Sequence, residues 1–408
     1  MKQNILPILF LVFSSLNILV SQRVSSLDEI LPKAVKEWEK PVQGVVMDIE
    51  VPKFDNHVYY VTEDEDKFRL YKTTLDGNQV WIREWDKGKP YHYVYGLKVS
   101  NWGNLVCVHS VDGSDENVRT RVYDGDGNLT YYSTRGRDSK GYKMGFYYPS
   151  PSGLYLSYEE TNGFSPLEIF TTKGEVIEIE NTSLLKGERH KHRFVAKDRL
   201  LVYEGFKGRG YLYLITVPDG NVSWTFEFDS PFWLIDFNER NCNYTDKYIA
   251  IQGTRRPSDL YLFDYGGNLI WKVGGLYSNH AISFSNNWQK VMTVDEGRNV
   301  VVIDVRTGKM TNKIYVDPWS LLNRPQFEML ENTLLITQAD GIGNLDEKIG
   351  VRYFSHIISL NPDGSKNEHM AIKGVISTKY DAESGSMVIL NAEIDKQTIT
   401  RRTKLVEE

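Results

Sequence analysis

Cysteine is scarce in this chain of 408 residues, which contains only Cys107 and Cys242 and no Cys-x-x-Cys pair. This scarcity excludes a zinc site built on cysteines and a small fold that depends on several disulfides. The separation of the two residues has no spacing signature of its own. Export would permit a disulfide, but we expect two separate buried thiols.

The sequence also lacks an excess of positive charge and the common local catalytic motifs. Its formal net charge of −6 disfavours a dedicated nucleic-acid binder, which is usually strongly basic. It contains no Gly-x-Ser-x-Gly, no His-Glu-x-x-His and no Gly-x-x-x-x-Gly-Lys. These absences argue modestly against a serine hydrolase, a zinc protease and a P-loop enzyme.

Only one long hydrophobic run occurs, and it lies at the N-terminus. Lys2 precedes an apolar stretch from Ile5 to Val20, and Ser21 ends an acceptable cleavage site. The rival interpretation is an uncleaved anchor, but the stretch is shorter than the roughly 20 residues that span a bilayer. We therefore expect a signal peptide at 1–21, a linker at 22–31 and an exported protein that is periplasmic, on the cell surface or secreted, without stable membrane insertion.

A glycine turn repeats along the rest of the chain, between segments with strand-like patterns. Asp-Gly and Gly-Asn pairs mark tight hairpins, because glycine adopts the positive φ that these turns require. The spacing between successive turns is close to 47 residues. The turn glycines are Gly77, Gly127, Gly174, Gly220, Gly267, Gly308 and Gly364.

Each repeat contains enough sequence for four strands, which is the content of one β-propeller blade. The units begin near residues 47, 97, 147, 194, 234, 281, 326 and 379, so we expect eight blades, with seven as the alternative. The last unit ends before a fourth strand, and Trp38 lies in a segment similar to that around Trp85. We predict one all-β propeller domain at 32–408, closed by an N-terminal strand that completes the last blade.

The Gly-Asn-x-x-Trp units at Gly77–Trp81, Gly220–Trp224 and Gly267–Trp271 resemble the pyrroloquinoline-quinone-like and WD40-like propeller repeats. Asp304–Gly308 resembles the acidic-to-Thr-Gly segment of the same repeat. The resemblance covers almost the whole chain and implies architecture only. Quinoprotein dehydrogenases of this superfamily have adjacent cysteines near the cofactor, and this chain has none. We therefore expect no cofactor. Non-enzymatic relatives act as exported assembly and scaffold proteins, but propellers host both binding and catalysis, so the fold does not settle function.

Two segments raise the question of a metal site. Asp124–Asn128 resembles the start of a calcium loop, but Leu129 and Arg135 occupy positions that need Gly and Glu, so a hairpin turn is favoured. His190 and His192 would face the same side of an extended segment, but their cationic neighbours favour a solvated loop or an anion contact over a metal. We predict no metal site.

One propeller face gathers aromatic and arginine residues on its loops, which are the usual components of a recognition surface. We expect the chain to be a monomeric binding or scaffold module for a protein, an anionic small molecule or a glycan. The alternative is an enzyme that acts on a carbohydrate or an ester, with His280, His190 and Arg324 as its catalytic groups. The predicted binding face consists of Tyr93, Arg135, Arg137, Tyr142, Trp233, Arg255, Arg256, Trp319 and Arg324.

Overall fold

The computed structural model describes residues 35–88, 92–112, 117–135, 145–160, 167–179, 185, 190–206, 209–228, 242–253, 257–277, 282–285, 288–297, 299–315, 325–330, 333–339, 353–360, 366–373, 375–381, 386–393 and 398–405. Within these ranges, 32 strands form eight four-stranded antiparallel sheets. A short 3-10 helix, η2 (Ala196–Asp198), connects two of the strands. The fold is therefore all-β, as the sequence predicts.

Strands that follow one another along the chain pair in sheets 1 to 4. Sheet 1 contains β2 (Val45–Glu50), β3 (His57–Glu63), β4 (Lys67–Thr74) and β5 (Gln79–Asp86). Sheet 2 contains β6 (His92–Val99), β7 (Leu105–Asp112), β8 (Val118–Asp124) and β9 (Leu129–Arg135). Sheet 3 contains β10 (Gly145–Pro149), β11 (Tyr155–Glu160), β12 (Glu168–Thr171) and β13 (Val176–Ile177). Sheet 4 contains β14 (Lys191–Val195), β15 (Arg199–Phe206), β16 (Arg209–Ile215) and β17 (Val222–Phe228).

The same order continues in sheets 5 to 7, and sheet 8 also takes a strand from the other end of the chain. Sheet 5 contains β18 (Cys242–Tyr244), β19 (Tyr248–Gln252), β20 (Ser258–Asp264) and β21 (Leu269–Leu276). Sheet 6 contains β22 (Ser283–Phe284), β23 (Lys290–Val294), β24 (Asn299–Asp304) and β25 (Met310–Tyr315). Sheet 7 contains β26 (Pro325–Leu330), β27 (Thr333–Ala339), β28 (Tyr353–Leu360) and β29 (Lys366–Lys373). Sheet 8 contains β30 (Val375–Asp381), β31 (Ser386–Glu393), β32 (Thr398–Leu405) and β1 (Val35–Pro41).

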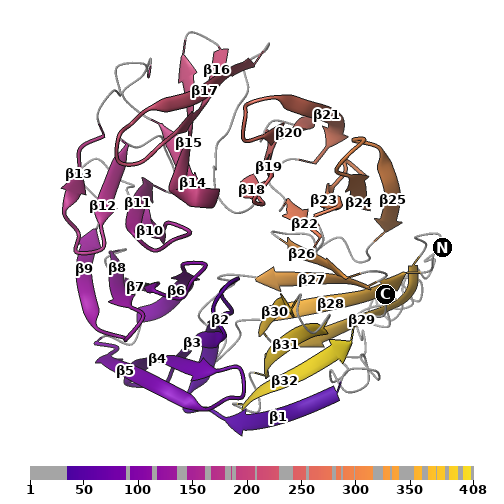
Figure 1. The fold of residues 1–408 in the computed structure, drawn as a ribbon. Coiled ribbons are helices and arrows are strands. Elements are labelled where there is room, and N and C mark those ends of the chain that lie inside the picture. Colours follow the sequence, from indigo (N-terminus) through magenta and orange to yellow (C-terminus); the bar gives the residue numbers. More distant parts are fainter. Residues whose placement is uncertain are drawn as a thin grey trace, which may run out of the picture.

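The sheets are arranged around a common axis, with the first strand of each sheet innermost (Figure 1). The hydrophobic core lies between neighbouring sheets, because both faces of a sheet in this arrangement are covered by its neighbours. Leu201 and Leu212 of sheet 4, for example, pack with Ile249 and Phe263 of sheet 5. Val388 and Leu390 of sheet 8 pack in the same way with residues of sheet 1.

Strand β1 lies at the outer edge of sheet 8, where it pairs with β32 from Val35–Thr403 to Pro41–Thr398. Its Trp38 also reaches sheet 1 and donates an indole N–H to the carbonyl of Leu75, at 3.0 Å. The two ends of the described chain therefore meet in one sheet, and that sheet contacts the first one.

The turn glycines lie between the third and fourth strands of their sheets and adopt positive φ, as their sequence pattern predicts. The described examples range from +67° at Gly308 to +86° at Gly267, and Gly364 lies outside the described residues. A Cβ atom on Gly267 would lie 2.6 Å from the ring of Trp224, which belongs to the preceding sheet. The recurrent aromatic residue of one repeat thus packs on the turn of the next.

The two faces of the molecule differ in the length of their connections. First-to-second and third-to-fourth strand connections share one face, which we call the short-turn face, and contain between two and six residues. Connections between sheets and between second and third strands share the opposite, long-connection face. Five of these are much longer, at 136–144, 178–190, 229–241, 316–324 and 340–352.

Both cysteines are buried, unpaired thiols, which confirms the prediction of two separate thiols. Burial raises the pKa of each, to about 12 for Cys242, where Glu159 adds to the effect and Arg193 opposes it. Neither thiol is therefore available as a reactive thiolate at neutral pH.

Candidate functional site

An exposed apolar patch lies on the short-turn face. It consists of Lys53, Phe54, Trp102, Leu154 and Trp288, all on connections between first and second strands, and we call it the axial patch. The side chains of Phe54, Trp102 and Leu154 are 44%, 59% and 59% exposed. Large apolar side chains that gather on one surface mark interaction sites more often than scattered ones do.

Hydrogen bonds between neighbouring sheets hold these connections together. The amide of Phe54 donates to the carbonyl of Asn101 at 2.8 Å, and the amide of Asn101 donates to the carbonyl of Pro151 at 3.0 Å. The amide of Ser152 then donates to Asp198 of sheet 4, at 2.9 Å. The exposed side chains therefore stand on a connected backbone, so that ordering them for binding costs little conformational entropy.

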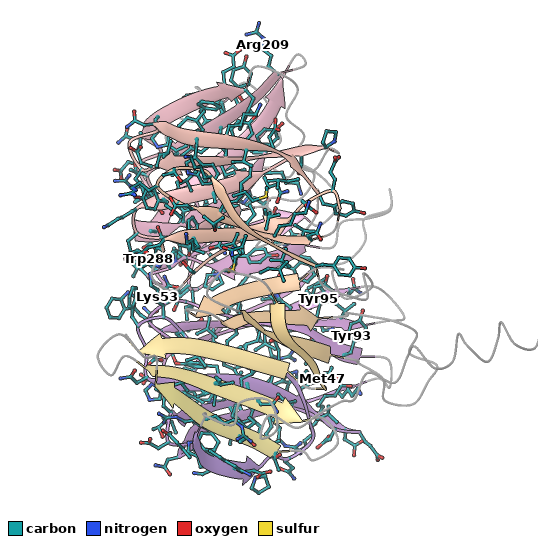
Figure 2. The ribbon with its side chains drawn as sticks, turned by 90° about the vertical axis from the view of Figure 1, so that its right-hand side faces the viewer. Met47, Lys53, Tyr93, Tyr95, Arg209 and Trp288 are labelled. Atoms are coloured by element: carbon teal, nitrogen blue, oxygen red, sulfur yellow. The ribbon has the colours of Figure 1, made fainter. Side chains whose placement is uncertain are left out.

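Lys53 connects opposite sides of the molecule. Its ammonium lies 3.4 Å from Asp246 Oδ1 of sheet 5, 4.6 Å from the ring centre of Trp288 and 5.0 Å from that of Phe54. Figure 2 shows Lys53 and Trp288 close together on one edge of the molecule. Phe54 in turn packs against Trp102, with ring centres 4.9 Å apart. A cation between two aromatic faces is attracted by both, and Asp246 balances its charge.

Trp288 adopts a φ of +58°, in the left-handed region that bulky residues rarely occupy. Its amide donates to the carbonyl of Ser285 at 2.8 Å, within the same turn. Such a conformation is unfavourable and persists only where the surrounding structure holds it. The half-buried indole ring therefore lies between Lys53 on one side and the apolar core of sheets 5 and 6 on the other.

The axial patch was not predicted from the sequence. Its members do show a signal, because Phe54, Trp102, Leu154 and Trp288 all lie one to three residues before the second strand of a repeat. A comparison of the repeats in register would reveal bulky apolar residues where a tight turn normally has polar ones. Their convergence at the axis depends on the arrangement of the sheets.

The predicted binding face corresponds to the long-connection face. Tyr93 lies in β6 and packs partly buried against Phe146 of sheet 3, and Figure 2 shows it on the edge opposite Lys53. The other residues, except Arg135, lie in connections outside the described residues, so their assignment remains a prediction. These are Arg137, Tyr142, Trp233, Arg255, Arg256, Trp319 and Arg324, together with the catalytic candidate His280.

Arg135 ends β9 and packs between sheets 2 and 3. Its Nη1 donates to Glu168 at 3.0 Å, and its guanidinium lies 4.0 Å from the ring centre of Tyr158. Burial opposes the charge, but Tyr147 and Glu168 outweigh it and raise the pKa of Arg135. The guanidinium of Arg135 is therefore already engaged within the protein, by the carboxylate of Glu168 and the ring of Tyr158.

The expectation of a solvated loop around His190 and His192 is wrong. His190 immediately precedes the innermost strand β14 and His192 lies within it, with exposed fractions of 4% and 1%. The alternating pattern of a strand places both on one side, as predicted, but that side faces the interior. His190 therefore lacks the solvent access that a catalytic group in an open funnel would have.

The Asp124–Asn128 segment forms the hairpin turn between β8 and β9. Asp124 Oδ1 accepts the amides of Asp126 and Asn128, at 3.0 and 2.8 Å, and its other oxygen accepts the side chain of Asn128. The hairpin interpretation is thus confirmed. Among the residues that the structure describes, no group of three or more His, Cys, Asp or Glu side chains could hold a metal ion.

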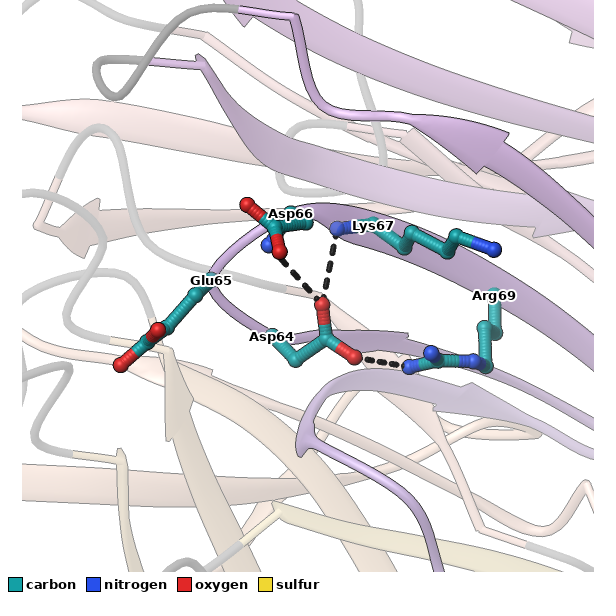
Figure 3. A pocket seen from close by; sticks show the side chains of 5 residues that line it. All are labelled: Asp64, Glu65, Asp66, Lys67 and Arg69. Carbon is teal, nitrogen blue, oxygen red and sulfur yellow. Dashed lines mark hydrogen bonds and ion pairs between the residues drawn. The ribbon is translucent and has the colours of Figure 1, made fainter.

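A shallow pocket of about 350 Å³ lies on the long-connection face, at the β3–β4 connection (Figure 3). Asp64 Oδ1 accepts the amides of Asp66 and Lys67, at 3.0 and 2.8 Å, and Oδ2 bonds Arg69. Arg69 also donates to Glu84 at 2.7 Å. Burial disfavours the charge of Asp64, but these hydrogen bonds outweigh it and lower its pKa. The charges of this pocket mainly stabilise the turn.

No helix in the described part of the chain is long and apolar enough to cross a membrane.

Comparisons with known proteins support the fold. No family model matches the chain, and no curated protein matches it either. Among solved structures, BamB from Moraxella catarrhalis is similar over 90% of this chain and 99% of its own, with a TM-score of 0.54 and 13% identity. The C-terminal WD40 domain of Sif2 is similar over 91% and 98%, with a TM-score of 0.50 and 10% identity. At these identities the likeness shows architecture alone, and the chain has the fold of a β-propeller.

Proposed function

We propose that this chain is an exported, eight-bladed β-propeller that acts as a protein-binding scaffold, and that the axial patch is a contact surface for its partner. The rigid exposure of Phe54, Trp102 and Leu154 carries this proposal. Export is supported by the N-terminal pattern of residues 1–21. Closure of the ring is supported by the pairing of β1 with β32.

The charges at the patch indicate the chemistry of the partner. Lys53 is compensated by Asp246, while Asp55 interacts with His57 and accepts the hydroxyl of Tyr59. The patch therefore offers aromatic and aliphatic surface around a cation whose charge is already balanced. A protein segment that presents apolar side chains fits this surface better than a strongly anionic ligand does, because burial of the apolar area would supply most of the affinity.

Substitution of the patch tests the proposal. A Trp102→Ala/Leu154→Ala variant and wild-type protein would each be used to capture proteins from the exported fraction of the source organism. Captured proteins would then be purified and their dissociation constants measured. We expect a partner whose binding is at least about 30-fold weaker to the variant, since truncation of a central anchor typically costs about 2 kcal/mol or more.

A matched variant controls for general surface hydrophobicity. Val176 and Leu269 are also exposed apolar residues, but they lie on the outer strands β13 and β21. Val176→Ala/Leu269→Ala should retain the partner, and thermal melts should show that both variants are folded. Equal binding by the patch variant and the wild type would reject the axial patch as the contact surface.

A second candidate function is anion recognition on the long-connection face, which the asymmetry between the two faces favours. Long loops on a rigid scaffold commonly carry binding residues, and Arg137, Arg255 and Arg256 belong to connections of this face. A thermal-shift screen with phosphates, sugar acids and acidic glycans tests it. A shift that disappears in an Arg255→Gln/Arg256→Gln variant would support this site, and no shift with any of these anions would reject it.

A further inference from the structure

The contact between sheets 3 and 4 contains a layer of buried ionisable side chains. It consists of Glu159 from β11, His190, Lys191 and His192 at β14, Glu204 from β15 and Tyr213 from β16, and we call it the polar seam. Exposed fractions of 1% for Lys191 and His192 and 0% for Glu204 show how completely it is enclosed.

The contacts within the polar seam connect strands of both sheets. Lys191 Nζ lies 3.9 Å from Glu159 Oε1, which is the ion pair between sheet 4 and sheet 3. His190 Nδ1 lies 3.5 Å from Glu204 Oε2, and the Tyr213 hydroxyl donates to Glu204 Oε1 at 2.5 Å. Arg193, Cys242, Tyr203 and Tyr211 are further ionisable groups nearby, and Arg193 donates to the carbonyl of Cys242 at 3.0 Å.

His192 is enclosed by apolar neighbours and contacts the backbone of Tyr158 in sheet 3. Its cross-strand partner is Val202, and Val202 and Phe194 pack against Ile169 of sheet 3. His190 and Lys191 adjoin it along the chain. The contact between sheets 5 and 6, in contrast, is a cluster of apolar residues that includes Leu262, Val291 and Val301.

We infer that the polar seam is an acid-sensitive contact, which opens as protons bind His192 while the apolar contact between sheets 5 and 6 stays closed. A proton on His192 would place a second cationic group beside Lys191 in a buried layer, and burying a charge without full compensation is unfavourable. Opening the seam hydrates the imidazole and relieves this repulsion.

The direction and size of the effect follow from linkage. Burial, and then the charges of His190 and Lys191, lower the pKa of His192 to about 3 in the closed seam. In an open seam the imidazole regains its ordinary pKa of about 6.5. The open form therefore binds the proton more strongly, and its population rises as the pH falls from about 6.5 towards 3. At pH 5 the opening equilibrium should be about 30-fold larger than at neutral pH.

Native-state hydrogen exchange of the full chain at pH 7.5 and pH 5.0 tests this inference, with rates corrected for the intrinsic effect of pH on exchange. Peptides that cover β11 and β14 should show about a 30-fold larger opening equilibrium at pH 5.0. Peptides that cover β20 and β24 should change much less. In His192→Gln, which cannot take up the proton, the response of β14 should fall below about threefold.

His109→Gln is the matched control, since His109 is another buried histidine but lies between sheets 2 and 3. It should keep the response of β14. An equal rise in all peptides, an unchanged response in His192→Gln, or its loss in His109→Gln would each overturn the inference. If His192→Gln does not fold, the wild-type comparison of β14 with β20 and β24 decides. The inference does not depend on a binding partner, so its failure leaves the proposed function unaffected.

Discussion

At the scale of single residues, two separate physical effects disfavour a side chain at glycines with positive φ. One is the backbone, because positive φ is costly for other residues. The other is space, because an aromatic ring of the preceding sheet rests on the turn. Gly267 combines both, whereas Gly275, which lies within strand β21 and not in a turn, has a φ of +76° and nothing within 4 Å of an added Cβ. This pair separates the two effects.

We predict that Gly275→Ala lowers the free energy of unfolding by about 1 kcal/mol, which is the cost of the left-handed conformation. Gly267→Ala should cost about 3 kcal/mol, since its methyl group would also displace the ring of Trp224 from its contact with the turn. Chemical denaturation of both variants measures the difference. Equal losses would show that the ring adapts freely and that the contact between sheets contributes little.

At the scale of secondary-structure elements, β1 is an edge strand that contacts two sheets. It covers the hydrogen-bonding edge of β32, and its Glu37 forms an ion pair with Arg401 at 2.7 Å. Arg401 also donates to the carbonyl of Leu75 at 2.7 Å, and Lys40 donates to that of Gly77 at 2.5 Å. The strand therefore stabilises sheet 8 and its contact with sheet 1 together.

Removal of residues 1–41 should lower the melting temperature by 10 °C or more and promote association, because the exposed edge of β32 can pair with other chains. Removal of residues 1–34 leaves β1 in place and serves as the comparison. Thermal melts and size-exclusion chromatography measure both effects. If the two truncated proteins have the same melting temperature and the same size, β1 is dispensable and the ring is held by its other contacts.

At the scale of the whole molecule, the buried histidines make stability depend on pH. Burial, and then the nearby charge of Lys98, lower the pKa of His109 to about 3, as burial and its neighbours also do for His192. A histidine with a lowered pKa stabilises the fold fully above its unfolded pKa of about 6.5. That contribution is lost as the pH falls towards 3, where the unfolded chain binds protons that the folded chain does not.

At pH 5 the free energy of unfolding should be lower than at pH 7.5 by about 2 kcal/mol for each of these histidines. In His109→Gln the loss of about 2 kcal/mol that is due to protonation of His109 should disappear. The free energy of unfolding should then depend less steeply on pH than in the wild type. Urea denaturation at several pH values measures this. A curve as steep as that of the wild type would show that His109 binds its proton equally well in the folded and unfolded chain.

The architecture was largely predictable because it follows from local rules that repeat. Each turn glycine, such as Gly127, lies between two strand-forming segments, and the recurrence of this pattern predicts four-stranded units along the chain. The interpretation of His190 and His192 failed for the opposite reason. Their charged neighbours in the sequence indicate a solvated loop, but β14 is the innermost strand of its sheet, so the packing of sheets 3 and 4 buries them.

The sequence by itself determined the all-β repeat and the positions of the turns, because strand alternation and glycine backbone preferences act over a few residues. Only the tertiary structure decided which residues meet at the axis. Lys53, Asp246 and Trp288 are far apart in the sequence and lie on turns of different sheets. They come together because the arrangement of the sheets around one axis brings opposite turns within reach of a single lysine side chain.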